Sequence, residues 1–256
     1  MDNGNGAVPR GAERWLETEA GVASSWRRLG EELRDFWLTI RRGRPEEQYA
    51  ERTLRRMARG KLRDTLGLEV RDEAATRAKA ERWLAQMIAL GLRPGHLCVE
   101  YGCGSLWCAE PFIRYLEPSR FVGLDVTDAF YAFGRQRLGA LLAEKRVRLD
   151  IVSRQSLREV AVLRPDFVFS HRVLHHVPPR GLARYLRNIC ALLDARTILV
   201  IEHMPRPRRD TPAKAPRYTA ADLQPLLPAG WVCDAHPFGF VITHRADDAA
   251  RMPARR

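Results

Sequence analysis

Two acids and two glycines near the middle of the chain have the spacing of a nucleoside-binding site. A short apolar strand candidate, His96–Glu100, ends at an acid and leads directly into Gly102-Cys103-Gly104, before a helical pattern that begins near Trp107. Glycines lack a Cβ, so such a turn lets backbone N–H groups and a helix N-terminus approach a ligand. A second strand candidate, Phe121–Val126, places Asp125 where it can accept hydrogen bonds from ribose hydroxyls. We expect the two strand tips to bracket one nucleoside.

The pattern disfavours a nicotinamide or flavin cofactor. Such a site would have a third glycine at position 107, where this chain has Trp107. Two glycines alone also occur in tight turns between core elements. The full series of acid, glycine turn, helix, strand and acid is much harder to obtain by chance.

These residues resemble the first two motifs of the class I S-adenosylmethionine-dependent methyltransferases. Glu100-Tyr101-Gly102-Cys103-Gly104 matches the acid and glycine-rich turn, and Gly123-Leu124-Asp125-Val126 matches the acid after the next strand. The common third glycine of that family would fall at position 106, which is Leu here. The resemblance implies S-adenosyl-L-methionine as cofactor, and it implies these cofactor-binding residues: Glu100, Tyr101, Gly102, Cys103, Gly104, Asp125, Val126, Ser153, Ser170 and His171.

The adenine side departs furthest from the family pattern. After the strand candidate Val147–Val152 the family usually has an acid and then a small residue, whereas this chain has Ser153-Arg154. Ser153 is expected to bind the adenine amino group through its side chain or its backbone.

Histidines gather on the expected acceptor side. The stretch from Asp166 to Pro178 resembles the family's fourth motif, which implies that His175 and His176 lie near the transferred methyl group. His203 follows a later strand candidate and could face the same pocket. A hydroxyl acceptor needs a general base, and a histidine has an unperturbed pKa near 6.5. We therefore predict that His175 and His203 are catalytic, and that the rate rises with pH through the histidine range.

The remaining histidines are not assigned a catalytic role. For His171 and His176, a structural, hydrogen-bonded role fits the sequence at least as well as catalysis. His96, His236 and His244 are expected at strand starts or on a distant hairpin. His171 and His175 are four residues apart, but Arg172 replaces the Glu of a zincin HExxH motif. The segment offers histidines rather than the carboxylates of metal-dependent O-methyltransferases, so no metal is expected.

The elements that must position these residues alternate as βαβ units. Alternation of strands and helices predicts an α/β fold, doubly wound around a mostly parallel sheet. Pro237-Phe238-Gly239 is too short for a parallel crossover, so the last two strands must form a C-terminal antiparallel hairpin. A seven-stranded sheet is what the resemblance implies. The strand candidates are His96–Glu100, Phe121–Val126, Val147–Val152, Phe167–Ser170, Thr197–Glu202, Trp231–His236 and Phe240–His244.

The domain organisation follows from composition. Residues 1–11 are predicted to be disordered, 12–90 to form a helical N-terminal extension, 91–245 to form the Rossmann-like domain and 246–256 to be a flexible tail. The extension contains helical patterns over Trp15–Ile40, Glu46–Leu66 and Glu73–Leu90. The basic, proline-rich stretch 204–217 is expected to be either a lid or a surface loop, before a helix that Thr219 could cap.

Composition limits the partners and the compartment. The chain has 256 residues, 45% of them hydrophobic, and no apolar run long enough to span a membrane. Because its start lacks a charged and then apolar pattern, we expect a cytoplasmic protein. Five cysteines without a CxxC pair indicate neither a disulfide framework nor a zinc knuckle. The net charge of +12 suits an anionic acceptor or nucleic acid, but only four of 43 basic residues are Lys, which could equally reflect coding bias.

Three functional hypotheses remain. The leading one is methyl transfer to a hydroxyl of a small-molecule or saccharide acceptor, possibly an anionic one. The second is an RNA methyltransferase, suggested by the basic charge. The third is a non-catalytic S-adenosylmethionine-binding protein, because Leu106 and Ser153 depart from the family pattern.

Overall fold

The computed structural model describes residues 49, 51–55, 73–203 and 216–245. The predictions for residues 1–11, Trp15–Ile40, the tail 246–256 and most of Glu46–Leu66 and 204–217 lie outside this part. The chain divides into two compact units, Met1–Arg44 and Pro45–Arg256, and every described residue belongs to the second. The domain boundaries expected at residues 90 and 245 stay a prediction.

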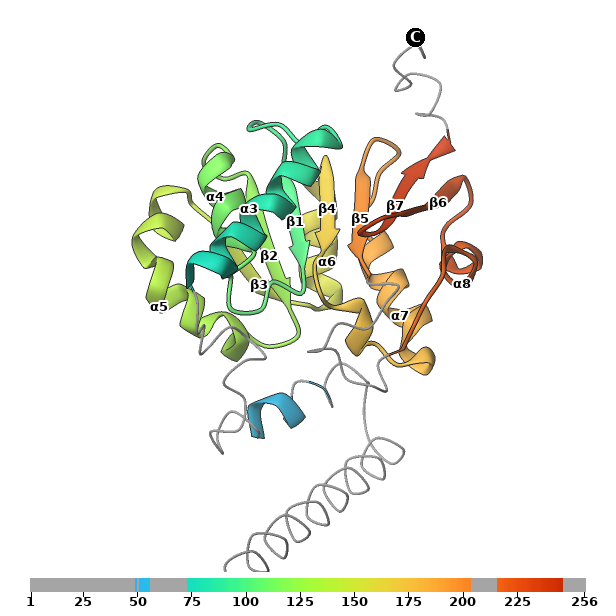
Figure 1. Cartoon of the computed structure of the whole chain (residues 1–256), viewed down its shortest axis with the longest axis horizontal. Helices are drawn as coiled ribbons and strands as arrows, with labels where there is room; N and C mark the ends of the chain where they lie inside the picture. The colour runs from blue at the N-terminus through green and yellow to red at the C-terminus, as the bar shows by residue number, and fades with distance from the viewer. Residues whose placement is uncertain (1–48, 50, 56–72, 204–215, 246–256) are drawn as a thin grey trace, which may run out of the picture. The chain divides into compact units, whose positions relative to one another are not determined.

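Seven strands form one mixed sheet in the order β3-β2-β1-β4-β5-β7-β6 (Figure 1). The first five pair in parallel, and β7 runs antiparallel to both β5 and β6. The expected fold is confirmed. The strands are β1 Cys98–Tyr101, β2 Phe121–Asp125, β3 Arg148–Ile151, β4 Phe167–Ser170, β5 Ile198–Glu202, β6 Trp231–His236 and β7 Gly239–His244.

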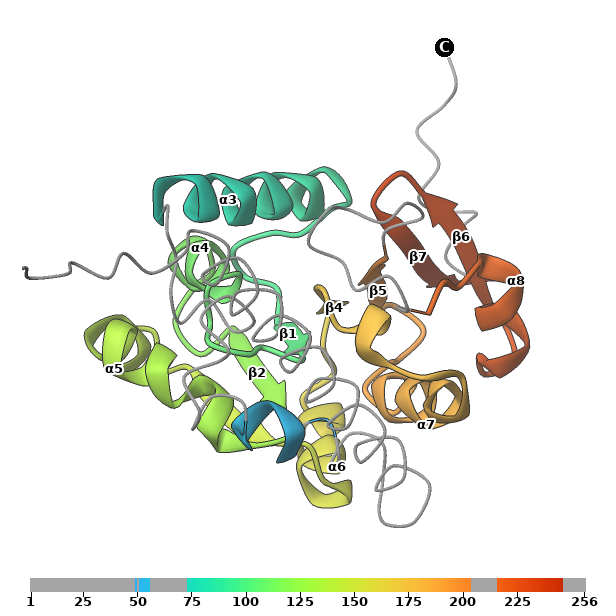
Figure 2. The ribbon, with the colours of Figure 1, turned by 60° about the horizontal axis from the view of Figure 1, so that its bottom comes forward.

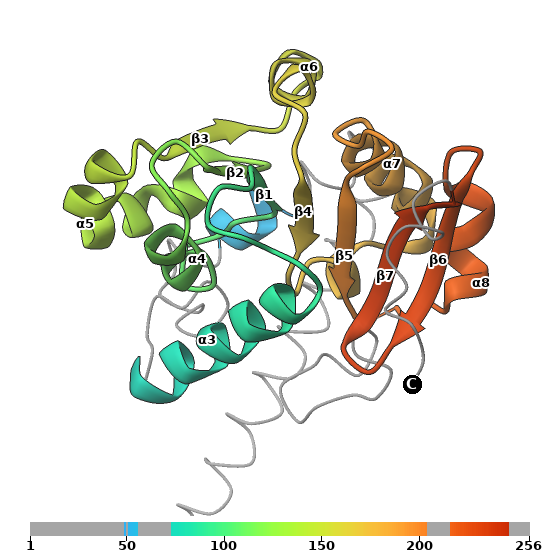
Figure 3. The same cartoon turned by 90° about the horizontal axis from the view of Figure 1, so that it is seen from above.

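Helices cover both faces of the sheet. Seen from above, α3, α4 and α5 lie on one side of the sheet and α6, α7 and α8 on the other (Figure 3). The helices are α3 Glu73–Ala89, α4 Ala109–Tyr115, α5 Asp128–Glu144, α6 Arg154–Val162, α7 Pro179–Cys190 and α8 Ala220–Leu223, with 3₁₀ turns η1 Leu174–His176 and η2 Gln224–Leu226. Tyr49 and residues 51–55 are also helical. Thr219 caps α8 through a reciprocal capping box with Asp222, as the sequence predicts.

Alternation along the strands divides the core into two layers. In β4, Phe167 and Phe169 are buried in the layer beneath α3, α4 and α5, whereas Val168 is buried in the layer beneath α6, α7 and α8. Cys98 and Val99 of β1 divide in the same way. Successive strand residues point to opposite faces, so a short, wholly apolar strand can fill both layers.

The strand order creates a switch point between β1 and β4. From β1 the chain moves outward to β2 and β3, and it then returns to β4 on the opposite side of β1. Crossovers that leave in opposite directions open a crevice at the carboxyl ends of the two strands. The ends of β1, β2, β4 and β5 lie along this edge of the sheet.

The C-terminal hairpin reaches the same edge. Because β7 is antiparallel to β5, its first residue, Gly239, pairs with Glu202, the last residue of β5. Gly239 has φ +145°, and a Cβ there would lie 2.2 Å from the Ile201 carbonyl oxygen, so only glycine fits this approach. The expectation that His236 lies on a distant hairpin is wrong, since His236 pairs with Gly239. His244, at the other end of β7, does lie away from this edge.

Two glycines of α5 provide a matched test of how closely this helix packs on the glycine turn. A Cβ at Gly134 would lie 2.7 Å from Leu106 Cγ and 2.7 Å from the Ser105 carbonyl oxygen, whereas a Cβ at Gly139 would meet nothing within 4 Å. We expect Gly134→Ala to lower the free energy of unfolding by about 1–3 kcal/mol through overpacking. Gly139→Ala should raise it by up to about 1 kcal/mol, because alanine favours a helix interior. Urea unfolding of both variants measures the difference, and equal effects would contradict the close packing.

Candidate functional site

The glycine turn after β1 is tied to the end of β2. The backbone N–H groups of Gly102 and Cys103 both donate to the Leu124 carbonyl oxygen, at 2.7 and 3.1 Å. Gly102 and Gly104 have φ of +89° and +51°, in the left-handed region that favours glycine. A Cβ at Gly102 would lie 2.3 Å from Val173 Cγ2, so the turn also packs closely against the segment after β4.

Asp125 joins the turn to the tip of β2. Its Oδ2 accepts a hydrogen bond from the Gly104 N–H at 2.6 Å, and its Oδ1 accepts one from the Val126 N–H at 2.7 Å. The side chain is buried. Burial raises the pKa of Asp125 to about 6, against the two backbone hydrogen bonds, which lower it. Each carboxylate oxygen keeps a lone pair with which to accept a further hydrogen bond.

Glu100 places a second acid on the neighbouring strand. It is 1% exposed, and its Oε2 has no hydrogen-bond partner among the described residues. Burial, together with the nearby Asp125, raises the pKa of Glu100 well above its usual value. A buried carboxyl oxygen without a partner is costly unless a ligand or water satisfies it. Both predicted acids therefore lie at this edge with remaining capacity to accept hydrogen bonds.

Leu106 keeps a glycine-like backbone at the position of the absent third glycine. Its φ is +63°, and its side chain is fully buried beneath α5. Arg137 of α5 holds this region: it donates to the Leu106 carbonyl oxygen at 3.3 Å and stacks over the Trp107 ring, with its Cζ 3.8 Å from the ring centroid. It also pairs with the buried Glu110. The turn therefore keeps its shape without the glycine, held by packing and by an arginine.

Three of the residues implied as cofactor contacts have clear packing roles. The buried Tyr101 side chain lies in the core layer beneath α6, α7 and α8, where its ring and the Tyr185 ring meet edge to face, with centroids 5.7 Å apart. Ser170 Oγ donates to the Tyr101 carbonyl oxygen at 2.8 Å, which links β4 to β1. Cys103 packs beside Gly123, where a Cβ would lie 3.0 Å from its sulfur. Their roles toward a cofactor stay predictions.

Ser153 caps α6. Its Oγ accepts from the Ser156 N–H at 3.0 Å, and its own N–H donates to Ser156 Oγ at 2.9 Å, which forms a capping box. Both of its polar groups therefore stabilise the helix start. The predicted adenine contact is untested, and it would have to coexist with this cap.

On the other side of the crevice, the end of β5 holds the loop that follows β4. Glu202 Oε2 accepts a hydrogen bond from the Arg172 N–H at 2.8 Å and lies 3.7 Å from His171 Nε2. Arg172 has φ +58°, so this hydrogen bond helps to hold a strained residue. The His171 ring also packs against Trp83 of α3 at 5.2 Å. Sequence reasoning missed Glu202, although its position at a strand end was a usable signal.

His175 and His176 form an imidazole pair on η1, with ring centroids 3.9 Å apart. Burial, reinforced by the Arg172 charge, lowers the pKa of His175 to about 4. Burial and the neighbouring His175 lower the pKa of His176 to about 3. Both rings are therefore neutral at physiological pH, which a proton acceptor requires.

The Nε2 atom of His203 has a structural contact. Its Nε2 accepts a hydrogen bond from the Tyr218 N–H at 2.9 Å, and Tyr218 in turn donates its hydroxyl to the Val177 carbonyl oxygen at 2.7 Å. The ring is buried and stacks on Phe240. Burial lowers its pKa. His203 therefore anchors residue 218 to the end of β5, and its predicted catalytic role stays a prediction.

Aromatic residues from α3 and the hairpin meet beside this loop. The Trp83 ring lies edge-on to Phe238 at 5.2 Å, and the Phe238 ring lies 3.8 Å from the His236 ring. The backbone N–H of His203 donates to the Phe238 carbonyl oxygen at 3.0 Å, which fixes the hairpin turn at the end of β5. Sequence reasoning assigned neither Trp83 nor Phe238 to the site, because their proximity depends on the tertiary fold.

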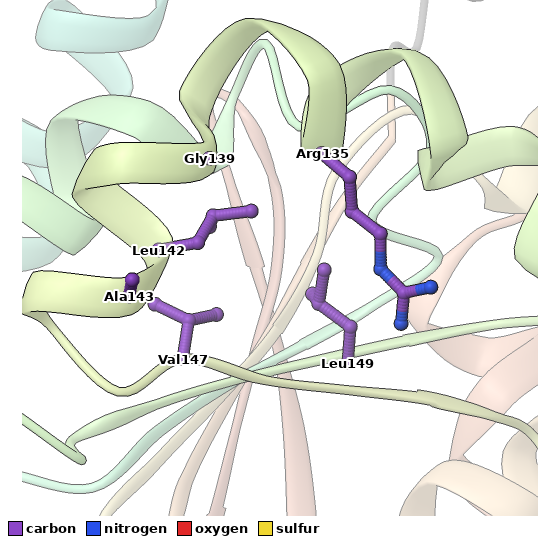
Figure 4. Close-up of a pocket in the computed structure, with 6 residues that line it drawn as sticks. All are labelled: Arg135, Gly139, Leu142, Ala143, Val147 and Leu149. Atoms are coloured by element: carbon purple, nitrogen blue, oxygen red, sulfur yellow. The ribbon is translucent and has the colours of Figure 1, made fainter.

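A pocket of about 330 Å³ lies apart from these residues, between α5 and β3. Arg135 and Leu142 extend from α5 toward Val147 and Leu149 (Figure 4). Leu149 pairs with Gly123, two residues before Asp125, so this pocket lies along the strands rather than at their carboxyl ends.

Within the described ranges there is no group of three or more His, Cys, Asp or Glu residues placed to hold a metal ion. In the same part of the chain, no helix has the length and apolar character of a membrane span.

Comparisons with known proteins show what this chain is similar to. A family model described as a methyltransferase domain matches residues 99–199, from β1 into β5. No curated protein matches the chain. Among solved structures, magnesium protoporphyrin IX methyltransferase (ChlM) from Synechocystis PCC 6803 with bound SAM is 20% identical, with 65% of this chain and 76% of that chain covered and a TM-score of 0.45.

Two further structures show the same level of similarity. The E81Q mutant of MtNAS in complex with S-adenosylmethionine is 17% identical, with 65% of this chain and 62% of that chain covered and a TM-score of 0.48. The PH0226 protein from Pyrococcus horikoshii OT3 is 11% identical, with 65% and 89% covered and a TM-score of 0.45.

The raised pKa of Asp125 predicts a pH-dependent stability. Because the pKa rises from 3.8 to about 6 on folding, the folded protein binds more protons than the unfolded chain between these values. Stability should therefore fall as pH rises through this window, by about 3 kcal/mol for two pKa units. Urea unfolding gives the free energy of unfolding of each protein. We expect the value for the wild type minus the value for Asp125→Asn to decrease from pH 4 to pH 6.5.

Gly139→Ala supplies the control for this measurement, because it changes no titratable group. The difference between the wild type and Gly139→Ala should not change in the same way over that window. A pH-independent difference for Asp125→Asn would mean that folding does not raise the pKa of Asp125.

Proposed function

We propose that the chain is a Rossmann-like, S-adenosylmethionine-dependent methyltransferase that transfers a methyl group to a hydroxyl oxygen of a small-molecule acceptor, because residues 99–199 match a methyltransferase domain. The observation that carries the proposal is the buried Asp125 carboxylate, held by the Gly104 and Val126 N–H groups at the tip of β2. This arrangement fixes an acceptor of hydrogen bonds beside a turn in which Gly102 and Gly104 carry no side chain.

The residues at this edge fit S-adenosylmethionine. Bound S-adenosylmethionine supplies a methyl group made electrophilic by its sulfonium. Asp125 would accept hydrogen bonds from ribose hydroxyls with its remaining lone pairs. Glu100 offers a buried oxygen without a described partner, which suits an ammonium group or a water that bridges to one. Two buried acids with raised pKa values also favour a cationic ligand, because a positive charge stabilises their ionised forms.

On the acceptor side, we assign the general base to His175. Its imidazole is neutral above about pH 5, since its pKa is about 4, so it can accept the hydroxyl proton at physiological pH. The same low pKa makes it a weak base. Each unit by which the pKa of the acceptor exceeds that of the base raises the free energy of proton transfer by about 1.4 kcal/mol. This favours an acidic hydroxyl, such as a phenol, over a saccharide hydroxyl.

His203 is the less favoured base. Its Nε2 already accepts the Tyr218 N–H, so taking a substrate proton there would break that hydrogen bond. Nδ1 is buried and has no hydrogen-bond partner among the described residues. In the neutral ring the accepting Nε2 leaves the proton on Nδ1, which is then a donor. His203 thus supports the site by holding Tyr218 near the end of η1.

The RNA alternative rests on charge alone. Its supports are the net charge of +12 and the basic stretches at 46–66 and 204–217, most of which lie outside the described part of the chain. The neutral histidine pair favours a hydroxyl acceptor, but it does not indicate whether that hydroxyl belongs to a small molecule or to RNA. RNA therefore stays the second hypothesis.

Cofactor binding tests the proposal directly. The wild type should bind S-adenosylhomocysteine in calorimetric titration, and Asp125→Ala should weaken the binding at least about tenfold, because it removes a charge-assisted acceptor. Asp234→Ala, which alters an exposed aspartate of β6, is the control and should bind like the wild type. No binding by the wild type, or equal binding by Asp125→Ala, would reject the cofactor assignment.

Turnover tests the base. With an acceptor found in a panel of phenols and saccharides, His175→Ala should lower turnover by about 10² or more, the scale for losing a general base, and leave cofactor affinity within a few-fold. His244→Ala, at the far end of β7, serves as the control. The sequence alone predicts a rate that rises near pH 6.5, but the pKa of about 4 moves the expected rise to that lower pH. A rate that still rises near pH 6.5, or a His175→Ala variant with normal turnover, would exclude this role.

A further inference from the structure

Tyr49 contacts both sides of the crevice. Its ring meets the edge of Phe130 at 6.2 Å and an interplanar angle of 85°, and it packs against His176 at 4.9 Å. Phe130 lies in the first turn of α5, just after the tip of β2, and His176 lies on η1, just after β4. One side chain from far earlier in the sequence therefore bridges two elements that belong to opposite sides of the switch point.

The surroundings of Tyr49 place it close to the cofactor-binding acid. Burial is the main cause that raises the pKa of its hydroxyl, and the Asp125 charge raises it further while the Arg172 charge lowers it. Its hydroxyl interacts with the side chain of Thr53, which is 4% exposed. Residues 51–55, drawn in blue, lie at the end of the sheet toward which β1, β2 and β4 point (Figure 2).

From these contacts we propose that Tyr49 is a cofactor-retaining residue: its ring closes the crevice between α5 and η1 over bound S-adenosylmethionine, so that Tyr49 must move aside for the cofactor to exchange. This role rests on the proposed function. The contacts of Tyr49 with Phe130 and His176 are made by its ring, so the aromatic face rather than the hydroxyl should carry the effect. An aromatic wall also suits a sulfonium, because cations are attracted to ring faces.

Closure has a kinetic signature that separates it from a role in acceptor binding. A residue that blocks the exit of a ligand slows dissociation more than it changes association, so most of its effect on affinity appears in the dissociation rate. A residue that only contacts the acceptor would change the KM for the acceptor and leave cofactor dissociation alone.

The test measures dissociation of S-adenosylhomocysteine from the full chain by stopped-flow competition. We expect Tyr49→Ala to dissociate the ligand about tenfold faster than the wild type, and Tyr49→Phe to stay within about twofold, because it keeps the ring. Tyr115→Ala is the matched control, since Tyr115 is a partly buried tyrosine whose hydroxyl contacts the Leu92 carbonyl oxygen, away from the crevice. Wild-type dissociation from Tyr49→Ala would overturn the proposal.

Hydrogen–deuterium exchange of the wild type keeps the proposal testable if Tyr49→Ala does not fold. The amides of Tyr49 and residues 51–55 should exchange more slowly when S-adenosylhomocysteine is bound, because a closed segment opens less often. Unchanged exchange there, with the ligand shown to be bound, would overturn the role of Tyr49 but leave the proposed function standing. A wild type that binds no S-adenosylhomocysteine would reject the proposed function and this role together.

Discussion

The Asp125 carboxylate is the interaction on which the site depends. Its two oxygens hold the Gly104 and Val126 N–H groups, so a single buried side chain fixes the glycine turn of β1 against the tip of β2. Burial would favour the neutral acid, and the two backbone donors oppose that tendency without cancelling it. The backbone thus holds the acid in place, while its ionisation still depends on the charge of a neighbouring ligand. A ligand that needs an ionised carboxylate meets one already oriented.

The loops on the two sides of the crevice are stabilised in different ways. On the β1–β2 side, Leu106 keeps a left-handed backbone beneath α5, so the turn is a property of the apolar core. On the β4–β5 side, a carboxylate at the end of β5, Glu202, holds the strained Arg172 by a hydrogen bond. The two sides therefore differ in what holds an unusual backbone: a buried leucine side chain on one and a carboxylate on the other.

Much of the fold was predictable because its signals are local. Short apolar runs separated by helical patterns predict all seven strands to within two residues, and the short connection Pro237-Phe238-Gly239 requires an antiparallel hairpin. What the sequence could not supply were contacts between distant segments. Tyr49 meets His176 only through the tertiary fold, and the pKa of His175 depends on burial and on the Arg172 charge. The position of His236 was predicted wrongly because an antiparallel strand beside β5 brings its turn to the site.

The antiparallel last strand has a consequence for how such a protein can diversify. The segment that matches the family model ends at residue 199, whereas the hairpin that places Phe238 against Trp83 follows it in the chain. One end of the crevice is therefore encoded separately from the other. A change in the length or composition of this one short hairpin would alter the contact between Phe238 and Trp83, whereas the hydrogen bonds of Asp125 to Gly104 and Val126 involve no hairpin residue.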